Sequence, residues 1–369
     1  MPVSEETVEL NAAGGPDPLR VVVLAGGVGG ARFVLGLRHL LTEPVSAGQA
    51  QISVVSNVGD DMWLCGLRIC PDLDSMMYAL AGVNDEARGW GRSDEGGRAA
   101  EELHGYGLGL PWFTLGDRDL GTHVARTHLL GRGLALSEAT ERLCARWQLG
   151  VRLLPATDDE VETLVEVESS ASGPGQVMHF ERWWVQHRAQ LPVRRFLSSN
   201  SSGGAPAPGV LEAIRAADVV LLAPSNPIVS VGPILNVGGV RESLTRTDAP
   251  VVGISPVIGG RVVRGMADVC LRAVGVGVDA GSVALHYGAR RSSAAGHDGG
   301  LLDGWLVAEE DHHLVGQLEE AGIAAAAVPL WMHSPRESAE MARAALELAG
   351  ITIGSSPCAK RSPATSPTA

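Results

Sequence analysis

Four aspartates in one short part of the chain have the types and spacing of a metal site. Asp60 and Asp61 end the segment NVGDD, which follows an apolar stretch at residues 51–56, and Asp72 and Asp74 belong to the segment PDLD. Mg²⁺ is held in proteins by one or two carboxylates together with water and substrate phosphates. If the two acidic turns meet in space, only Arg68 lies between them in sequence to offset their repulsion. A bound cation would relieve that repulsion better, so the pattern predicts a magnesium site.

The segment PDLD also has a simpler interpretation. Residues 75–81 are predicted to form a helix, and aspartate is favoured at the residue that caps a helix N-terminus. Asp72 or Asp74 would then cap this helix without binding a metal. The sequence leaves both interpretations open.

A glycine-rich turn at residues 26–30 predicts where a phosphate would bind. Gly26, Gly27, Gly29 and Gly30 separate an apolar stretch, residues 21–25, from apolar residues at helical spacing. Glycines allow a tight turn and a close approach to a ligand, and the N-terminus of the following helix offers free N–H groups to a phosphate. A tight turn without a ligand is the alternative, because a lone motif of this kind is weak.

The residues around this turn exclude two large classes of nucleotide-binding protein. A dinucleotide fingerprint counted from Gly27 would need glycine at position 32, where the chain has Arg32. A P-loop needs a lysine after its glycines, and the only lysine of the chain is Lys360. Arg32 could instead meet a phosphate as a bidentate donor.

Short apolar segments that end in small polar residues predict the elements that position these groups. Residues 218–223 lead into the segment PSNP, and residues 250–254 lead into SPVIGG. In parallel sheets ligands bind beyond the carboxyl ends of the strands, so these ends are expected to form one composite site. Residues 301–307 and 324–328 are predicted as final strands and 335–349 as a closing helix, whereas residues 161–167 and 177–185 are predicted to pair as a hairpin.

The predicted fold class is therefore α/β. We expect a Rossmann-like, mainly parallel sheet sandwiched by helices, built from residues 19–61 and 151–354. Residues 62–150 are expected to form a smaller, mostly helical insertion or lid. Residues 1–18 and 355–369 are expected to be a disordered leader and tail.

Composition narrows the partners and the location. The formal net charge of −13 argues against binding to nucleic acid, which relies on clustered positive charge. No apolar run reaches the roughly 18 residues of a membrane helix, so no membrane partner is expected. The five cysteines include no C-x-x-C pair and read as free thiols of a cytoplasmic protein.

Two further segments carry side chains for which both a ligand-binding and a structural interpretation are open. Trp90 stands between two glycines and is either a stacking platform for a planar ligand or an ordinary, partly buried tryptophan. In LGDRDLGTH and the residues after it, Asp119, His123 and Arg126 share one helix face, which looks either into a cleft or into solvent. Asp117 or Asp119 caps this helix in the second interpretation.

Eight motifs occur in one order along the chain and together resemble a known family. They are GGVGGAR, NVGDD, GLRICPDLD, GWG, LGDRDLGTH, LLPATDD, APSNP and SPVIGG. This order is similar to that of 2-phospho-L-lactate transferases, in particular the actinobacterial FbiA/CofD type, from about residue 21 to residue 350.

The resemblance implies a Mg²⁺-dependent enzyme of coenzyme F420 biosynthesis. It would move a phosphoenolpyruvyl or 2-phospho-L-lactyl group from a guanosine-diphosphate-linked donor to the ribityl hydroxyl of the deazaflavin Fo. The products would be dehydro-F420-0, or F420-0, and GMP. Actinobacterial members are expected to use the enolpyruvyl donor. The partners would be small-molecule substrates, and the enzyme is expected to be a homodimer.

The resemblance also implies roles for particular residues. The metal would be held by Asp60 and Asp72, with Asp61 and Asp74 as alternates or outer neighbours. Asp61 or Asp117 would accept the proton of the attacking hydroxyl. The donor would be bound by Gly26, Gly27, Val28, Gly29, Gly30, Arg32, Ser225, Asn226, Ser255, Gly259 and Gly260. The acceptor would be bound by Asn57, Trp90, Asp117, Arg118 and His123.

A rival interpretation shares the opening glycine turn. Regulators of the YvcK-like group bind a sugar nucleotide and catalyse no reaction. The segments GWG and LGDRD and the segment HYGARR around Arg290 favour the transferase, because they would belong to the deazaflavin side of the site. An oxidoreductase that binds a dinucleotide is excluded by the glycine spacing and by Asn57, which stands where that class places an acid.

Overall fold

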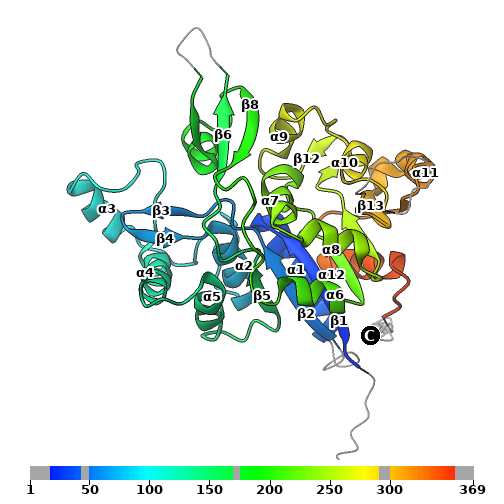
Figure 1. Ribbon diagram of the computed structural model, residues 1–369, viewed down its shortest axis with the longest axis horizontal. Helices are drawn as coiled ribbons and strands as arrows, with labels where there is room; N and C mark the ends of the chain where they lie inside the picture. Colours follow the sequence, from blue (N-terminus) through cyan, green and yellow to red (C-terminus); the bar gives the residue numbers. More distant parts are fainter. Residues whose placement is uncertain (1–16, 43–49, 169–174, 291–299, 354–369) are drawn as a thin grey trace, which may run out of the picture.

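A seven-stranded parallel sheet forms the centre of the molecule. The computed structural model describes residues 17–42, 50–168, 175–290 and 300–353 (Figure 1). The strand order is β14-β13-β10-β9-β1-β2-β5, and every neighbouring pair is parallel. The strands are β1 (Leu19–Ala25), β2 (Ala50–Ser56), β5 (Arg152–Pro155), β9 (Val219–Leu222), β10 (Val251–Ile254), β13 (Gly304–Ala308) and β14 (Ala324–Val328). The α/β fold with a mainly parallel sheet is confirmed.

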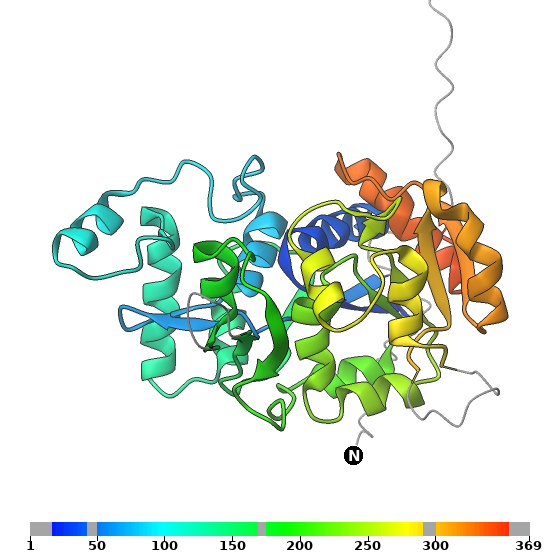
Figure 2. The same ribbon diagram turned by 90° about the horizontal axis from the view of Figure 1, so that it is seen from above.

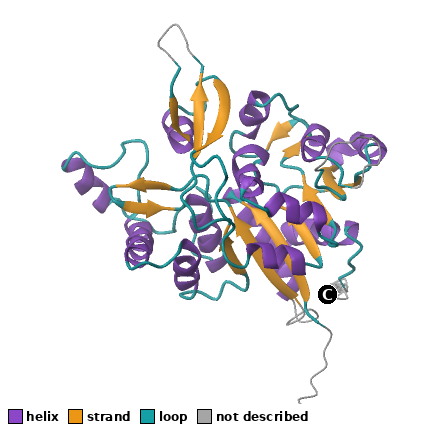
Figure 3. Ribbon diagram, viewed as in Figure 1, coloured by secondary structure: helices purple, strands orange, loops and turns teal. Residues whose placement is uncertain are grey.

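Helices cover both faces of the sheet (Figure 3). Along β1, Val21 and Val23 face one apolar layer and Val22 and Leu24 face the other, which is why the strand reads as a continuous apolar run. The first layer is formed by α1 (Gly27–Thr42), α2 (Pro71–Ala81), α5 (Leu136–Cys144) and α12 (Pro335–Leu348). The second is formed by α6 (Val210–Ala216), α7 (Gly232–Asn236), α8 (Val240–Arg246), α10 (Ala280–Tyr287) and α11 (Val315–Glu320).

Residues 62–150 contain helices and one β-hairpin. The hairpin pairs β3 (Met62–Leu64) with β4 (Leu67–Ile69), and the helices are α2, α3 (Arg98–Gly105), α4 (Asp117–Gly131) and α5. The hairpin, α3 and α4 lie beside the sheet on the left of Figure 1. Because α2 and α5 pack into the first apolar layer, the insertion is partly continuous with the core. Its boundaries as a separate unit stay a prediction.

The start of α2 corrects one sequence-based interpretation. The helix begins at Pro71, one turn before the predicted start, and its N-cap is Cys70. Asp72 and Asp74 lie inside the first turn, so neither of them caps the helix. Proline is well suited to the first helical position because its missing N–H would have no partner there. The capping interpretation of Asp117 and Asp119 is wrong for the same reason, since both lie inside the first turn of α4.

A small antiparallel sheet stands above the central one. β6 (Thr163–Val167) pairs with β7 (Val177–His179), as predicted, and also with β8 (Val193–Ser198), which the sequence analysis did not predict. The predicted strand to residue 185 is wrong beyond His179, because the chain turns into a π-helix, Arg182–Gln186. Phe180 and Trp183 occur at helical spacing, and both bury their rings in the core of this small sheet.

The remaining elements complete the loops around the sheet. They are a π-helix at Pro227–Val231, β11 (Val257–Ile258), β12 (Arg261–Val262), α9 (Ala267–Ala273) and a 3₁₀ helix at Glu309–Leu314. Within the described residues, no helix combines the length and the apolar character that crossing a membrane requires. The predicted leader, residues 1–18, lies outside the described residues apart from its last two residues, and the predicted tail, residues 355–369, lies wholly outside them.

Candidate active site

A cavity of about 930 Å³ opens at the carboxyl ends of the sheet strands. Its wall includes the glycine turn after β1, Asp60 after β2, Ser225 and Asn226 after β9, and Ser255 after β10. The chain continues from β1 to β2 on one side and from β9 to β10 on the other, so the sheet order reverses between β1 and β9. Such a reversal leaves a crevice in which ligands of α/β proteins bind. The predicted convergence of strand ends is therefore present.

The glycine turn is held in place by close packing and by Ser225. Gly27 adopts a φ of +65°, and a Cβ on Gly29 would lie 2.8 Å from the backbone oxygen of Pro224. The Gly26 N–H donates to Ser225 Oγ at 3.1 Å, and this hydroxyl donates to the Gly26 oxygen at 2.8 Å. These bonds join the ends of β1 and β9. Gly27, Val28 and Gly29 line the cavity at the N-terminus of α1, and a helix N-terminus is suited to an anion.

The other residues predicted for the donor divide into wall residues and supports. Val28, Arg32 and Asn226 line the cavity, and Arg32 is exposed. Gly30 lies behind the wall, where a Cβ would meet Ser225 Oγ at 2.7 Å. Asn226 Oδ1 accepts the N–H groups of two following residues and so closes its own turn.

The turn between β11 and β12 is not part of the wall. Gly259 and Gly260 are exposed at the tip of this hairpin with φ values of +55° and +71°, and the Gly259 N–H donates to Asp311 at 2.9 Å. These two glycines therefore allow the tight turn of the hairpin. Of the SPVIGG segment, Ser255 is the predicted residue that the structure brings to the cavity.

Three acids on the cavity wall are buried without compensating positive charge. Asp60, Asp72 and Glu181 are each at most 6% exposed, and none forms an ion pair within the described part of the chain. Burial raises the pKa of Asp72 to about 6, although Asn57 donates to its Oδ2 at 2.9 Å. Burial, and then the charge of Asp72, raises the pKa of Glu181 to about 8. Burial, followed by Asp72 and Glu181, raises the pKa of Asp60 well above its usual value.

This acidic cluster, Asp60, Asp72 and Glu181, has the chemistry of a divalent cation site. Asp60 Oδ1 is buried and has no hydrogen-bond donor among the described residues. Buried carboxylates are costly unless they are paired, protonated or bound to a metal. Oxygen ligands with a net negative charge are what Mg²⁺ binds. The residues therefore fit the predicted metal.

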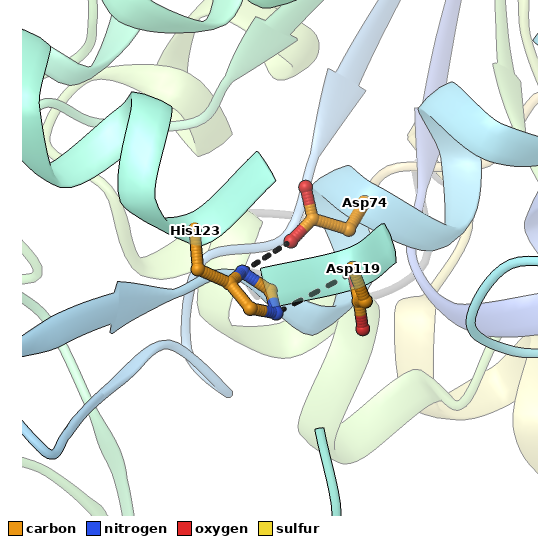
Figure 4. Close-up of side chains that lie close together, drawn as sticks. All are labelled: Asp74, Asp119 and His123. Carbon is orange, nitrogen blue, oxygen red and sulfur yellow. Dashed lines mark ion pairs between the residues drawn. The ribbon is translucent and has the colours of Figure 1, made fainter. Parts of the chain in front are cut away.

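A second group, Asp74, Asp119 and His123, also brings possible ligand atoms within 4.8 Å of one another (Figure 4). His123 Nδ1 lies 3.5 Å from Asp74 Oδ2, and Nε2 lies 3.4 Å from Asp119 Oδ1. Arg126 is buried and binds both carboxylate oxygens of Asp74, and the Tyr78 hydroxyl donates to Asp119 Oδ1 at 2.6 Å. The guanidinium of Arg126 on α4 already neutralises Asp74 on α2, so this group serves to join the two helices. It therefore fits a metal less well than the acidic cluster.

The structure does not bring the two predicted proton acceptors to the cavity wall. Asp61 is fully buried behind the wall and pairs with Arg68 at 3.4 Å; burial raises its pKa to about 7 against the effect of Arg68. Asp117 Oδ1 accepts the N–H of Ala99 at 3.0 Å, at the start of α3. Asp119, from the same motif as Asp117, does line the cavity.

The predicted acceptor residues are partly on the wall. Trp90 and His123 line the cavity, and Trp90 is 49% exposed. Asn57 is fully buried, and its side chain holds Asp72 and the backbone of Gly59. Arg118 is exposed outside the wall, where its backbone N–H donates to Glu95.

Arg290 does not belong to the acceptor side, as the segment HYGARR had suggested. Its side chain is 4% exposed and pairs with Asp303, and it donates to the backbone oxygens of Leu244 and Thr247. These partners precede β10 and β13 in the chain, at the amino ends of the strands. Arg290 therefore fastens the edge of the sheet opposite the cavity.

Several wall residues were missed by the sequence analysis. They are Glu181, Tyr78, Trp112, Trp184, Arg188, Arg264, Trp331 and His333. Glu181 carried a usable signal, because a single acid within the aromatic run HFERWW is unusual for a strand. Tyr78 lies on α2 and Trp184 on the π-helix, whereas the others come from loops, and only the fold brings all of them together.

Comparisons with known proteins agree with this architecture. A profile of the family described as "2-phospho-L-lactate transferase CofD" matches residues 21–335. A protein named phosphoenolpyruvate transferase from Streptomyces griseus is 51% identical over 331 residues, 90% of this chain and 98% of that protein. One of the same name from Mycolicibacterium smegmatis is 48% identical over 338 residues, 91% of this chain and 100% of that protein.

A solved structure shares the fold at low identity. It is a protein of the upf0052 family from Bacillus halodurans, with a TM-score of 0.52 and 17% identity over 89% of this chain and 99% of that one. At this level the likeness concerns the fold alone.

Removing the Glu181 carboxylate is expected to change how stability depends on pH. Folded Glu181 keeps its proton up to a pKa of about 8, whereas the unfolded chain releases it near 4.5. The folded state binds more protons in this window, so wild-type stability falls as pH rises through it. In metal-free buffer, the melting temperature of Glu181→Gln should increasingly exceed that of wild type between pH 5 and 8.

Thermal unfolding followed by circular dichroism across this pH range measures the difference. Glu101→Gln, on the exposed side of α3, is the matched control and should follow wild type at every pH. If the melting temperatures of wild type and Glu181→Gln differ by the same amount at every pH, the pKa of Glu181 is not raised in the folded protein.

Proposed function

Since the chain belongs to the 2-phospho-L-lactate transferase CofD family and is a transferase, we propose that it acts in coenzyme F420 biosynthesis. It moves a phosphoenolpyruvyl group from a guanosine-diphosphate-linked donor to the deazaflavin Fo and releases GMP. The names of its relatives favour the enolpyruvyl donor over the 2-phospho-L-lactyl donor. The cytoplasmic location and the homodimer stay predictions.

The observation that carries the proposal is the buried acidic cluster beside the glycine turn. A diphosphate bound at the N-terminus of α1 would lie next to Asp60 and Asp72, since a Cβ on Gly26 would run into the Asp72 carboxylate. We propose that Asp60 and Asp72 hold Mg²⁺, with Glu181 alongside. When bound, the metal would neutralise the diphosphate and stabilise the charge that develops on the leaving phosphate.

The chain's own groups orient the donor. Gly27, Val28 and Gly29 line the cavity at the start of α1, where helix N–H groups have no intrahelical acceptor, and Arg32 lies in the next turn of this helix. Such groups stabilise negative charge without rearranging during the reaction. Asn57 keeps Asp72 in position, so the acidic cluster and the phosphate site have a fixed relation.

The transfer itself is a displacement at phosphorus. The hydroxyl oxygen of the acceptor forms a new bond to the phosphorus that carries the enolpyruvyl group. The bond from that phosphorus to the bridging oxygen breaks, and this oxygen leaves with GMP. We propose that Asp119 receives the hydroxyl proton in place of Asp61 and Asp117. Its two contacts, with Tyr78 and His123, both use Oδ1, and its side chain is 15% exposed toward the cavity it lines.

The acceptor is a planar tricycle, and one part of the wall suits it. Trp90 and Trp112 of the insertion line the cavity, and so do Tyr78 of α2 and Trp184. Aromatic rings bind a flat heterocycle by stacking. We therefore propose that the acceptor binds between the insertion and the small antiparallel sheet, with Asp119 nearby.

An activity assay tests the function directly. Purified protein with Fo, Mg²⁺ and the enolpyruvyl donor should give GMP and a product with the mass of dehydro-F420-0, and the lactyl donor should give less or none. Mass spectrometry identifies the products. No product with either donor, together with tight binding of a sugar nucleotide, would place the protein among non-catalytic regulators instead.

Loss of Asp60 should abolish both metal binding and turnover. At pH 8, Mg²⁺ is expected to raise the melting temperature of wild type but not of Asp60→Asn, because binding to the folded state alone stabilises it. Turnover should fall by at least about 100-fold. Asp248→Asn, an exposed aspartate before β10, is the control and should keep both properties. An Asp60→Asn variant that responds to Mg²⁺ like wild type would move the metal elsewhere.

Asp117 and Asp119 stand two residues apart in the first turn of α4 and give a matched pair. Asp119→Asn is expected to lower kcat by about 10²- to 10⁴-fold, the usual contribution of a general base, while Fo binding changes little. Asp117→Asn should keep kcat within a few-fold, because that side chain caps α3. Steady-state kinetics and Fo fluorescence titration measure both. The reverse result would return the role to Asp117.

A further inference from the structure

Two aromatic rings form a stacked pair at the end of the cavity farthest along the sheet from β2. Trp331 and His333 follow β14, the edge strand, and both line the cavity. Their rings lie 5.7 Å apart at an angle of 14°. Trp331 is 42% exposed, so a large apolar surface faces solvent beside a ligand cavity. Neither residue has a role in the site described above.

A hydrogen bond and an ion-pair contact hold the two rings in one orientation. Trp331 Nε1 donates to Glu310 Oε1 at 3.3 Å, and His333 Nδ1 lies 3.3 Å from Glu337 Oε2. Glu337 belongs to the capping box that begins α12, and it also accepts the backbone N–H groups of His333 and Ser334. The pair is therefore ordered by the chain itself, and a ligand that stacks on it would lose little further freedom of these side chains.

The position of the acidic cluster fixes the direction of the donor. Asp60 follows β2 and Asp72 lies at the start of α2, on the β2 side of the glycine turn. The phosphorus that is attacked must lie near these acids and near the acceptor. The other half of the donor then extends from the turn past Ser225 and Ser255, after β9 and β10, toward β13 and β14.

The two ends of the cavity thus differ in what they offer. Seen from above, the insertion helices α3 and α4 lie on one side of the molecule, and α11 and α12 lie on the other (Figure 2). Asp119 and the rings of Trp90 and Trp112 belong to the insertion end of the wall, and Trp331 and His333 follow β14 at the other end. A nucleoside is the part of the donor that reaches the β14 end.

We infer that the Trp331–His333 pair is the stacking platform for the nucleobase of the donor. This inference rests on the proposed function, because a nucleoside-diphosphate donor supplies the base. The indole offers a large flat surface, and base–aromatic stacking requires no hydrogen-bond pattern. The platform therefore provides affinity for the base, while the glycine turn and the metal provide affinity for the phosphates.

Binding measurements on Trp331 variants test the inference. Isothermal titration with excess Mg²⁺ uses GDP, inorganic pyrophosphate and Fo as three separate probes. Trp331→Ala should weaken GDP binding by about 10- to 100-fold, the range expected for one stacked base. Trp331→Phe, which keeps a ring, should stay within a few-fold of wild type. Affinities for pyrophosphate and Fo should not change.

Trp63 provides a matched control. It is 46% exposed, and its indole N–H also donates to a carboxylate, Glu160, at 3.0 Å, but it stands on β3 outside the cavity wall. Trp63→Ala should bind all three probes like wild type. Melting temperatures of all variants confirm that each is folded.

The outcomes separate the inference from the proposed function. If Trp331→Ala binds GDP like wild type, or loses pyrophosphate affinity equally, the platform does not hold the base and the inference is overturned while the transferase stands. If Trp331→Ala loses Fo affinity instead, the pair belongs to the acceptor and the inference is again overturned. A wild-type protein that binds neither GDP nor Fo would overturn the proposed function, and the inference with it.

Discussion

Uncompensated negative charge, buried at the carboxyl edge of the sheet, is the constraint around which this molecule is organised. Asp60, Asp72 and Glu181 come from a strand end, a helix start and the small antiparallel sheet, and each is almost fully buried. Bringing three carboxylates out of water and close together costs free energy that apolar packing must offset. A protein keeps such a cluster where a cation or a reacting group needs it. The surrounding packing holds the acids close to the phosphate site.

The four aspartates of the two acidic segments have different partners and therefore different uses. Asp61 is paired with Arg68, and Asp74 is bound by Arg126, so both charges are balanced by the protein itself. Asp60 and Asp72 have no arginine partner in the described chain. The paired aspartates join α2, α4 and the β3–β4 hairpin; Asp61 lies behind the wall, and Asp74 lines the cavity with its charge balanced by Arg126. The unpaired ones face the cavity and are available to a metal.

The sheet topology gives the cavity its direction. The reversal between β1 and β9 places the glycine turn and Ser225 side by side, and their mutual hydrogen bonds close the floor of the crevice. On the β2 side stand the acids and the aromatic residues of the insertion, and on the β14 side stands the Trp331–His333 pair. This arrangement suits a donor that carries the transferred group at one end, beside the acids, and a flat base at the other end, beside the Trp331–His333 pair.

The sequence alone determined the fold class and the location of the phosphate site. Apolar runs such as residues 21–25, followed by glycines or small polar residues, have few structural solutions, because a strand buried on both faces must lie in a parallel sheet covered by helices. Local residues also excluded two nucleotide-binding motifs. A P-loop needs a lysine after its glycines, and none follows them here; a dinucleotide fingerprint needs glycine at position 32, where the chain has Arg32. The ordered motifs pointed to the family, which the comparisons confirmed.

Only the tertiary structure decided which polar residues face the cavity. Whether Asp61 or Asp119 reaches a ligand depends on pairing with Arg68 or His123, and these partners come from elements whose packing no local pattern encodes. The sequence suggested that Arg290 belongs to the acceptor side of the site, whereas in the structure it binds Asp303 and Leu244 at the edge of the sheet away from the cavity. Glu181 and Trp331 lie in segments far from the motifs. Charge, hydrogen bonding and burial are properties of neighbours in space, and for these residues the neighbours are set by long-range contacts.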